Sequence, residues 1–157
     1  MICGEGPNRD RLEQAARGLA NIRFHDLQPR ERLSELLGLA TIHLLPQIPG
    51  AADLVLPSKL TNMLASGRAV VATADFGTGL AAEVDGCGIL TQPGNAAAFA
   101  GAIETLLDRP QLRQLLANSA RARAEQRWSK NAILSRFEAE LDTVASARPQ
   151  LFGRRAR

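Results

Sequence analysis

The sequence predicts an α/β fold: a Rossmann-like, doubly wound parallel sheet followed by a helical carboxy-terminal region. Short apolar runs alternate with stretches whose apolar residues recur at helical spacing, which is the pattern of a parallel sheet covered by helices on both faces. Glycine-rich turns stand where several of these runs give way to a helix. From residue 95 onward the pattern is helical only, and a chain of 157 residues can bury one core.

The predicted elements follow one another without an internal repeat. The first are strand 1–3, a helix from the Gly4-Glu5-Gly6-Pro7 turn to about residue 19, strand 22–25, helix 30–40 and strand 42–45. Next come helix 58–67, strand 70–73, a glycine-rich loop with a short helix over 76–85, and strand 88–90. The last are helices 95–108, 110–128 and 129–147.

Two segments make up the predicted domain organisation. Residues 1–147 form the α/β domain, and because it opens on the end of a strand, we expect a segment upstream of it to be missing. Residues 148–157 carry Arg148, Arg154, Arg155 and Arg157 with no acid after Asp142, which predicts a disordered basic tail. Alternatively, the tail contacts an anionic membrane face or nucleic acid. Of these two partners, we retain the membrane face as a possible contact and predict no binding to nucleic acid.

Composition narrows the function classes. Hydrophobic residues make up 45%, and the net charge of +3 lies mostly in the tail. Aromatic residues at 4%, with no tyrosine, argue against a stacking surface for single-stranded nucleic acid. Cys3 and Cys87 are far apart, and His25 and His43 fall on separate predicted strands, so we expect no disulfide framework and no metal site. Without a signal peptide or an apolar run of about 20 residues, the predicted location is the cytoplasm, with the tail as a peripheral membrane contact.

A lone lysine marks the most informative loop. Lys59 is one of two lysines among seventeen arginines, and it follows Pro57 and Ser58 at the predicted start of a helix. A cation at a helix amino terminus costs roughly 0.3–1 kcal/mol unless an anion is present. The free amides of that turn, together with Lys59, therefore predict a phosphate site. The alternative is a Lys59 side chain extended into solvent.

Two other turns are weaker candidates. The Gly4-Glu5-Gly6-Pro7 turn allows close approach of a ligand to the backbone, but a plain strand-to-helix turn explains it equally well. The loop over 75–80 is a second phosphate- or sugar-facing candidate. No P-loop and no Gly-x-Gly-x-x-Gly pattern is present. Arg121, Arg123 and Arg127 are predicted to form a solvated basic face opposite an apolar stripe of Leu112, Leu115 and Leu116.

As a set, these motifs resemble the carboxy-terminal, nucleotide-sugar-binding domain of family-4 glycosyltransferases of the GT-B fold. The set comprises Gly4-Glu5-Gly6-Pro7, Arg23-Phe24, residues 39–46, Pro57-Ser58-Lys59-Leu60, residues 65–73, residues 77–88 with Glu83 and Asp85-Gly86-Cys87-Gly88, and residues 121–128. It covers about residues 2–145 and is most similar to colanic-acid and related exopolysaccharide glycosyltransferases.

The resemblance implies a retaining transferase whose donor substrate is a nucleoside-diphosphate sugar, with no further cofactor. Its substrate-binding residues would be Gly4, Gly6, Leu27, Asp53, Leu54, Val55, Leu56, Pro57, Ser58, Lys59 and Asn62. The 57–59 loop would bind the diphosphate, and the turn at Asp26 and Leu27 would meet the base. Asn62 and Leu54 stand where the family has two glutamates, so Asn62 would contact the ribose without a charge. No catalytic residue is assigned.

The resemblance also implies a partner. The acceptor-binding amino-terminal domain and the family's arginine–lysine phosphate pair lie upstream in relatives, so the chain would be a truncated product or a split subunit, incomplete for catalysis alone. The helix over 129–147 would return to that domain, which leaves its stripe of Ile133, Phe137, Leu141 and Val144 partly exposed. The alternatives are a non-catalytic, partner-binding remnant and half of a sugar-nucleotide epimerase.

Overall fold

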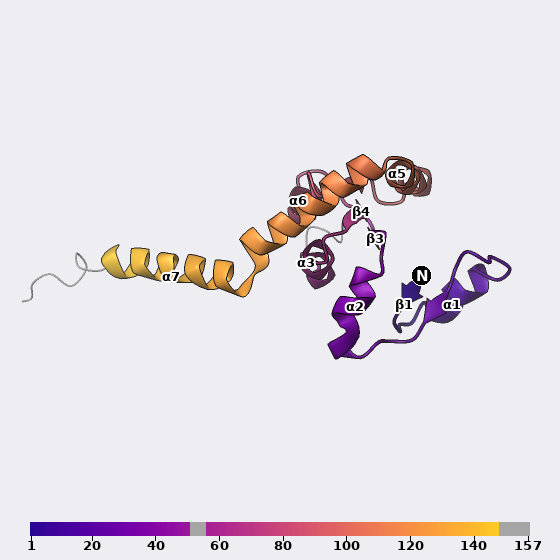
Figure 1. Ribbon diagram of the computed structural model, residues 1–157, viewed down its shortest axis with the longest axis horizontal. Coiled ribbons are helices and arrows are strands. Elements are labelled where there is room, and N and C mark those ends of the chain that lie inside the picture. Colours follow the sequence, from indigo (N-terminus) through magenta and orange to yellow (C-terminus); the bar gives the residue numbers. More distant parts are fainter. Residues whose placement is uncertain (51–55, 148–157) are drawn as a thin grey trace, which may run out of the picture. The chain divides into compact units, whose positions relative to one another are not determined.

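The computed structural model of the chain describes residues 1–50 and 56–147 (Figure 1). Its backbone contacts divide it into two compact units, Met1–Leu39 and a second unit that begins at Ala40. The basic tail lies outside the described residues, so its predicted disorder and membrane contact stay predictions.

The first unit is a small parallel βαβ arrangement. Strand β1 (Ile2–Cys3) pairs with β2 (Phe24–His25), with Ile2 opposite Phe24 and Cys3 opposite His25. Helix α1 (Arg9–Ala15) connects them. It ends four residues earlier than expected, because residues 16–18 form a turn that includes Gly18 at a φ of +83°. The predicted helix over 30–40 is a 3₁₀ turn, η1 (Arg30–Arg32), followed by α2 (Leu33–Gly38).

The second unit contains a three-stranded parallel sheet in the order β3 (Ile42–Leu45), β4 (Ala69–Thr73), β5 (Gly88–Thr91). Each crossover carries a helix, α3 (Ser58–Ala65) before β4 and α4 (Gly79–Val84) before β5. The chain then forms α5 (Ala96–Asp108), α6 (Pro110–Trp128) and α7 (Lys130–Ala147). Helix α6 packs against α3, α5 and the sheet, while α7 follows it (Figure 1). These elements confirm the predicted α/β class with a helical carboxy-terminal region.

Strand β4 is buried on both faces, as expected for the central strand of a covered parallel sheet. Val70 and Ala72 face one core cluster, which also contains Leu45, Leu60, Leu64, Leu80, Val84, Cys87, Ala120 and Ala124. Ala69 and Val71 face the opposite cluster with Ala102, Leu106 and Leu116. Leu60 and Leu64 are fully buried, and each contributes roughly 1.5–3 kcal/mol of burial free energy that holds α3 in place.

The predicted solvated arginine face of α6 is confirmed in part: the side chains of Arg121 and Arg127 are 57% and 50% exposed, but each of the three arginines also binds a neighbouring helix. Arg121 donates from Nη1 to the carbonyl oxygen of Ala65, and Arg123 donates from Nη1 to the carbonyl oxygens of Ala82 and Glu83. These carbonyls lie at the carboxyl ends of α3 and α4, where the helix dipole favours a cation. The apolar stripe is also narrower than expected, because Leu115 is 63% exposed.

Within the described residues, no helix is both long and apolar enough to cross a bilayer. The same residues contain no group of three or more histidine, cysteine or acidic side chains that could hold a metal ion.

Candidate functional site

The glycine turn of the first unit closes the carboxyl end of the small sheet. Gly4 follows β1 at a φ of +128°, a value that favours glycine, and its N–H donates to the carbonyl oxygen of His25 at 3.1 Å. The carbonyl oxygen of Gly6 accepts from the N–H of Arg9 at 3.0 Å. A Cβ placed on either glycine would meet no atom within 4 Å, so the space beside this turn is open.

Arg9, which the sequence patterns did not assign to the site, joins this turn to the end of β2. Its Nη1 donates to the carbonyl oxygens of Gly4 at 2.9 Å and His25 at 3.4 Å, and its Nη2 pairs with the Asp26 carboxylate at 3.0 Å. Its Nε donates to the Glu13 carboxylate at 2.7 Å. The hydrogen bond to Glu13 and the nearby charges of Glu13 and Asp26 raise the pKa of Arg9, so it stays charged.

The turn after β2 presents exposed backbone. Leu27 is 70% exposed, and neither its N–H nor its carbonyl oxygen has a hydrogen-bond partner among residues 1–50 and 56–147. The preceding carbonyl, that of Asp26, accepts from Gln28 Nε2 at 3.0 Å. Leu27 therefore offers one free donor and one free acceptor, the kinds of group that pair with the edge of a nucleotide base.

The start of α3 carries the predicted phosphate loop. Pro57 is extended (φ −62°, ψ 124°), the helix has no side-chain cap at this end, and no acid lies in its first turn. Ser58 and Lys59 are exposed. Lys59 forms no ion pair with any residue in the described part of the chain. A helix start with free amides and an unpaired ammonium group suits an anion.

The other predicted site residues near the start of α3 differ in their burial and in whether the structure describes them. The Leu56 side chain is partly buried and packs against the core cluster that contains Val70 and Ala72. Asp53, Leu54 and Val55 lie outside the described residues, and their role stays a prediction.

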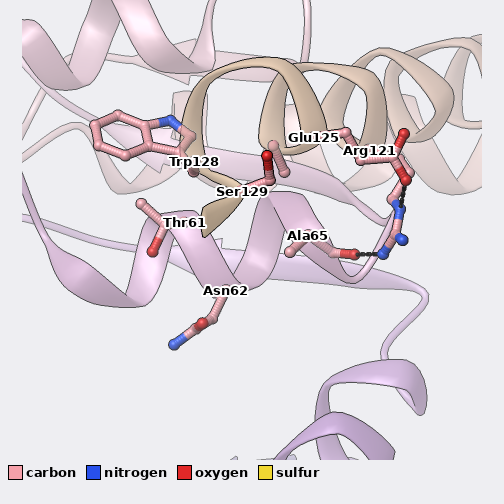
Figure 2. A pocket seen from close by; sticks show the side chains of 8 residues that line it. Thr61, Asn62, Ala65, Arg121, Glu125, Trp128 and Ser129 are labelled. Carbon is pink, nitrogen blue, oxygen red and sulfur yellow. Dashed lines mark hydrogen bonds and ion pairs between the residues drawn. The ribbon is translucent and has the colours of Figure 1, made fainter. Parts of the chain in front are cut away.

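Asn62 is exposed on the second turn of α3 and borders a groove of about 220 Å³ between α3 and α6. Figure 2 shows this groove, with Trp128 and Ser129 at the end of α6 and Arg121 joined to Ala65 and Glu125. The Asn62 amide points away from α6 in this view.

The segment after β3 is tied to the end of β4 at the carboxyl edge of the larger sheet. The Thr73 hydroxyl donates to the carbonyl oxygen of Gln47 at 2.8 Å and accepts from its N–H at 2.6 Å. Thr78 caps α4, accepting from the N–H of Ala81 at 3.2 Å and donating to the carbonyl oxygen of Asp75 at 2.9 Å. The Thr78 side chain thus stabilises the loop over 75–80. This capping role explains the threonine at this position, and no ligand is needed to explain it.

The structure groups the predicted residues by unit. Gly4, Gly6 and the Asp26–Leu27 turn belong to the first unit, where Arg9 connects them; Leu56 to Asn62 belong to the second. Arg9 could have been found from its position, two residues after Pro7 in the glycine turn and four before Glu13, which is the spacing of a helical ion pair.

Residues 1–109 match the family described as Glycosyl transferases group 1. Over 141 residues the chain is 38% identical to WcaI of Escherichia coli (strain K12), whose name assigns it to colanic acid biosynthesis as a glycosyl transferase. The aligned region is 87% of this chain but 34% of WcaI, so the chain spans about a third of that relative's length.

Solved structures share the fold. Anabaena Alr3699/HepE in complex with UDP-glucose matches with a TM-score of 0.71 at 22% identity, over 90% of this chain and 40% of that one. Sucrose-phosphate synthase from Thermosynechococcus elongatus matches with a TM-score of 0.74 at 22% identity, over 92% of this chain and 37% of that one. The chain therefore belongs to the group 1 glycosyl transferases and has the α/β fold of one domain of a GT-B enzyme.

Proposed function

We propose that this chain is the donor-binding half of a retaining glycosyltransferase that moves a sugar from a nucleoside-diphosphate sugar to a surface-polysaccharide or lipid-linked acceptor. Family membership, the name of WcaI and the UDP-glucose complex of HepE support this proposal. The observation that carries it is the start of α3, where amides without a side-chain cap stand beside Lys59, which has no ion-pair partner within the described residues.

A diphosphate at this helix start would be held by fixed dipoles and one point charge. Leu60 and Leu64 anchor α3 in the core, so the amides of its first turn do not have to reorganise when an anion binds. The Lys59 ammonium group would add a charge-assisted contact to the phosphate oxygens. An anion at this position would also offset the electrostatic repulsion between the Lys59 ammonium group and the positive end of the α3 dipole.

The remaining contacts would orient the nucleoside. The exposed N–H and carbonyl of Leu27 would bind the edge of the base, with Gly4 and Gly6 allowing close approach of the nucleotide to the backbone. The Asn62 amide would hydrogen-bond a ribose hydroxyl. Asp53, Leu54 and Val55 complete the proposed donor loop.

Catalysis would consist mainly of stabilising the leaving group. Negative charge develops on the diphosphate as the bond from the sugar to its phosphate oxygen breaks, and interactions that strengthen with that charge accelerate the reaction. On this chain, the Lys59 ammonium and the α3 amides would fill that role. The acceptor would be bound by an amino-terminal GT-B domain, in the same polypeptide or as a split subunit, and this chain alone is expected to bind the donor without transferring its sugar.

Isothermal titration of the chain with UDP, ADP and GDP tests the proposal. We expect one of them to bind and Lys59→Ala to weaken it about tenfold, because a hydrogen bond to a charged group is worth about 1.5–3 kcal/mol. Lys130→Ala is the matched control, since Lys130 is the other lysine of the chain and is exposed on α7. Absence of heat with all three nucleotides, or equal affinity of Lys59→Ala and the unmodified chain, would contradict the phosphate site.

A second candidate is a partner-binding module without catalysis. The observation that favours it is the apolar stripe of α7, whose members Ile133, Phe137, Leu141 and Val144 are all exposed. This candidate predicts complex formation with a partner and no nucleotide binding in the titration above.

A further inference from the structure

We propose that Arg9 is a positioning residue that sets the base-contacting turn at Leu27 and thereby the base preference of the site. This inference rests on the proposed function, because it concerns how the same donor site reads its nucleotide.

Strands β1 and β2 contribute only two residues each, and two-stranded pairs of this length are marginal in water. The turn at Asp26 and Leu27 begins where this short ladder ends. Backbone pairing alone therefore fixes the turn weakly, and a further cross-link is needed to hold its exposed N–H and carbonyl in one place.

The Arg9 guanidinium supplies that cross-link. Nη1 reaches the carbonyl oxygens of Gly4 and His25, one at the end of each strand, while Nη2 reaches the Asp26 carboxylate within the turn. The planar, rigid guanidinium group binds all three acceptors at once, and the Arg9 side chain is only 24% exposed. Glu13, one helical turn along α1, fixes the remaining Nε–H.

These contacts make a direct ligand role for Arg9 unfavourable. Four of its five N–H groups already have acceptors, so a phosphate would have to displace an existing partner. Arg9 also pairs with Asp26, whose side chain is otherwise exposed, and so reduces the repulsion between that carboxylate and an anionic nucleotide. Its effect on the ligand therefore passes through the turn.

The experiment compares two ligands that share the diphosphate but not the base. The full chain is titrated with its preferred nucleoside diphosphate and with inorganic pyrophosphate. For Arg9→Ala we expect about tenfold weaker nucleoside diphosphate binding, a smaller preference among UDP, ADP and GDP, and unchanged pyrophosphate affinity. Arg11→Ala is the control, because Arg11 lies on the same helix, is exposed and makes no side-chain hydrogen bond or ion pair within the described residues.

A conservative variant keeps the test decisive if Arg9→Ala fails to fold. Arg9→Lys retains the charge but cannot reach both strand ends and Asp26 together, so we expect it also to lose base preference while its unfolding temperature stays close to that of the unmodified chain. Full base preference in Arg9→Lys, or an equal loss of affinity for pyrophosphate and nucleotide in Arg9→Ala, would overturn the positioning role. If only these variants lose nucleotide binding, the proposed function stands. If the unmodified chain binds no nucleotide, both the proposed function and the positioning role of Arg9 are overturned.

Discussion

At the scale of single residues, His43 is a buried titratable group outside the proposed donor site. It lies on β3, is 7% exposed, and its Nε2 is 2.9 Å from the Ser66 hydroxyl. That hydroxyl donates to the carbonyl oxygen of Met63 at 2.6 Å, so it accepts the proton of His43 Nε2. Burial, and secondarily the charge of Arg68, lower the pKa of His43, so the folded chain keeps this ring neutral.

The lowered pKa of His43 predicts a loss of stability in mild acid. The unfolded chain takes up this proton near its ordinary pKa of 6.5, before the folded chain does. The stabilising contribution is therefore complete above that pH and falls as the pH drops below it. The free energy of unfolding, measured with urea, should be lower at about pH 5.5 than at about pH 7.5. This pH-dependent difference should be smaller for His43→Leu than for the unmodified chain. His25→Leu is the control, because His25 is exposed, and this variant should show the same pH-dependent difference as the unmodified chain. Equal differences in all three proteins would refute the role of His43.

Gly88 shows the strictest steric demand on a single residue. It lies opposite Val70 in the pairing of β4 with β5, and a Cβ at this position would be 2.0 Å from the Val70 carbonyl oxygen. Because backbone cannot move aside cheaply in the centre of a sheet, Gly88→Ala should cost about 3 kcal/mol of unfolding free energy. Gly101→Ala is the control: it lies within α5 in open space and should gain about 0.5–1 kcal/mol from better helix propensity. A Gly88→Ala protein as stable as the unmodified chain in chemical denaturation would contradict the strand pairing.

At the scale of elements, α6 holds α3 and α4 through side chains that reach their carboxyl ends. Arg121 and Arg123 contact carbonyl oxygens there, and the Glu83 carboxylate at the end of α4 accepts from Arg127 at 2.7 Å and from Trp128 Nε1 at 3.2 Å. Since α3 presents the proposed phosphate loop, these contacts fix the helix that would bind the donor. The basic residues of α6 therefore serve packing within this unit.

Removing the Glu83 carboxylate should loosen the junction of α4 with α6. Its side chain is 13% exposed while that of Arg127 is 50% exposed, so we expect Glu83→Ala to cost about 1 kcal/mol after allowance for solvent screening. Trp128 is the only tryptophan of the chain, so its fluorescence reports the change directly. Glu125→Ala, which breaks the exposed pair with Arg121, should change stability by less than about 0.5 kcal/mol. Identical unfolding curves and emission spectra for Glu83→Ala and the unmodified chain would exclude this role.

At the scale of the whole molecule, α7 leaves an apolar stripe without cover among the described residues. Ile133, Leu134, Phe137, Leu141 and Val144 are exposed on this helix, as the sequence predicted for most of them. Continuous apolar surface of this kind promotes association between chains. Sedimentation of the isolated chain should show a mass that rises with concentration, and Phe137→Lys should suppress that rise.

The matched control for association is Leu115→Lys on α6, where a single exposed leucine lies outside the stripe. We expect this variant to associate as the unmodified chain does. A chain that remains monomeric at all concentrations, or equal suppression by both substitutions, would show that the α7 stripe does not drive association.

Sequence patterns predicted the bounds of helices and strands well where residues at the ends of the element, such as proline, mark its start or stop. Strand β3 and helix α6 have the predicted bounds, because Pro46 follows the strand and Pro110 occupies the first turn of the helix. Helix α1 is shorter than predicted, since its apolar residues are exposed and provide little packing to extend it. The family motifs likewise lie in continuous segments, and so the family was predicted correctly from them.

By itself, then, the sequence determined the order of strands and helices, the family, and the start of α3 at Ser58, since each depends on residues that are neighbours along the chain. Only the tertiary structure decided the roles of the arginines. Arg121 and Arg123 contact carbonyls 56 and 41 residues away, and Arg9 meets His25 at a separation of 16. Their acceptors are mostly backbone carbonyls, which every residue possesses, so no residue type marks the partner in the sequence. Such contacts exist only after the fold brings strand and helix ends together.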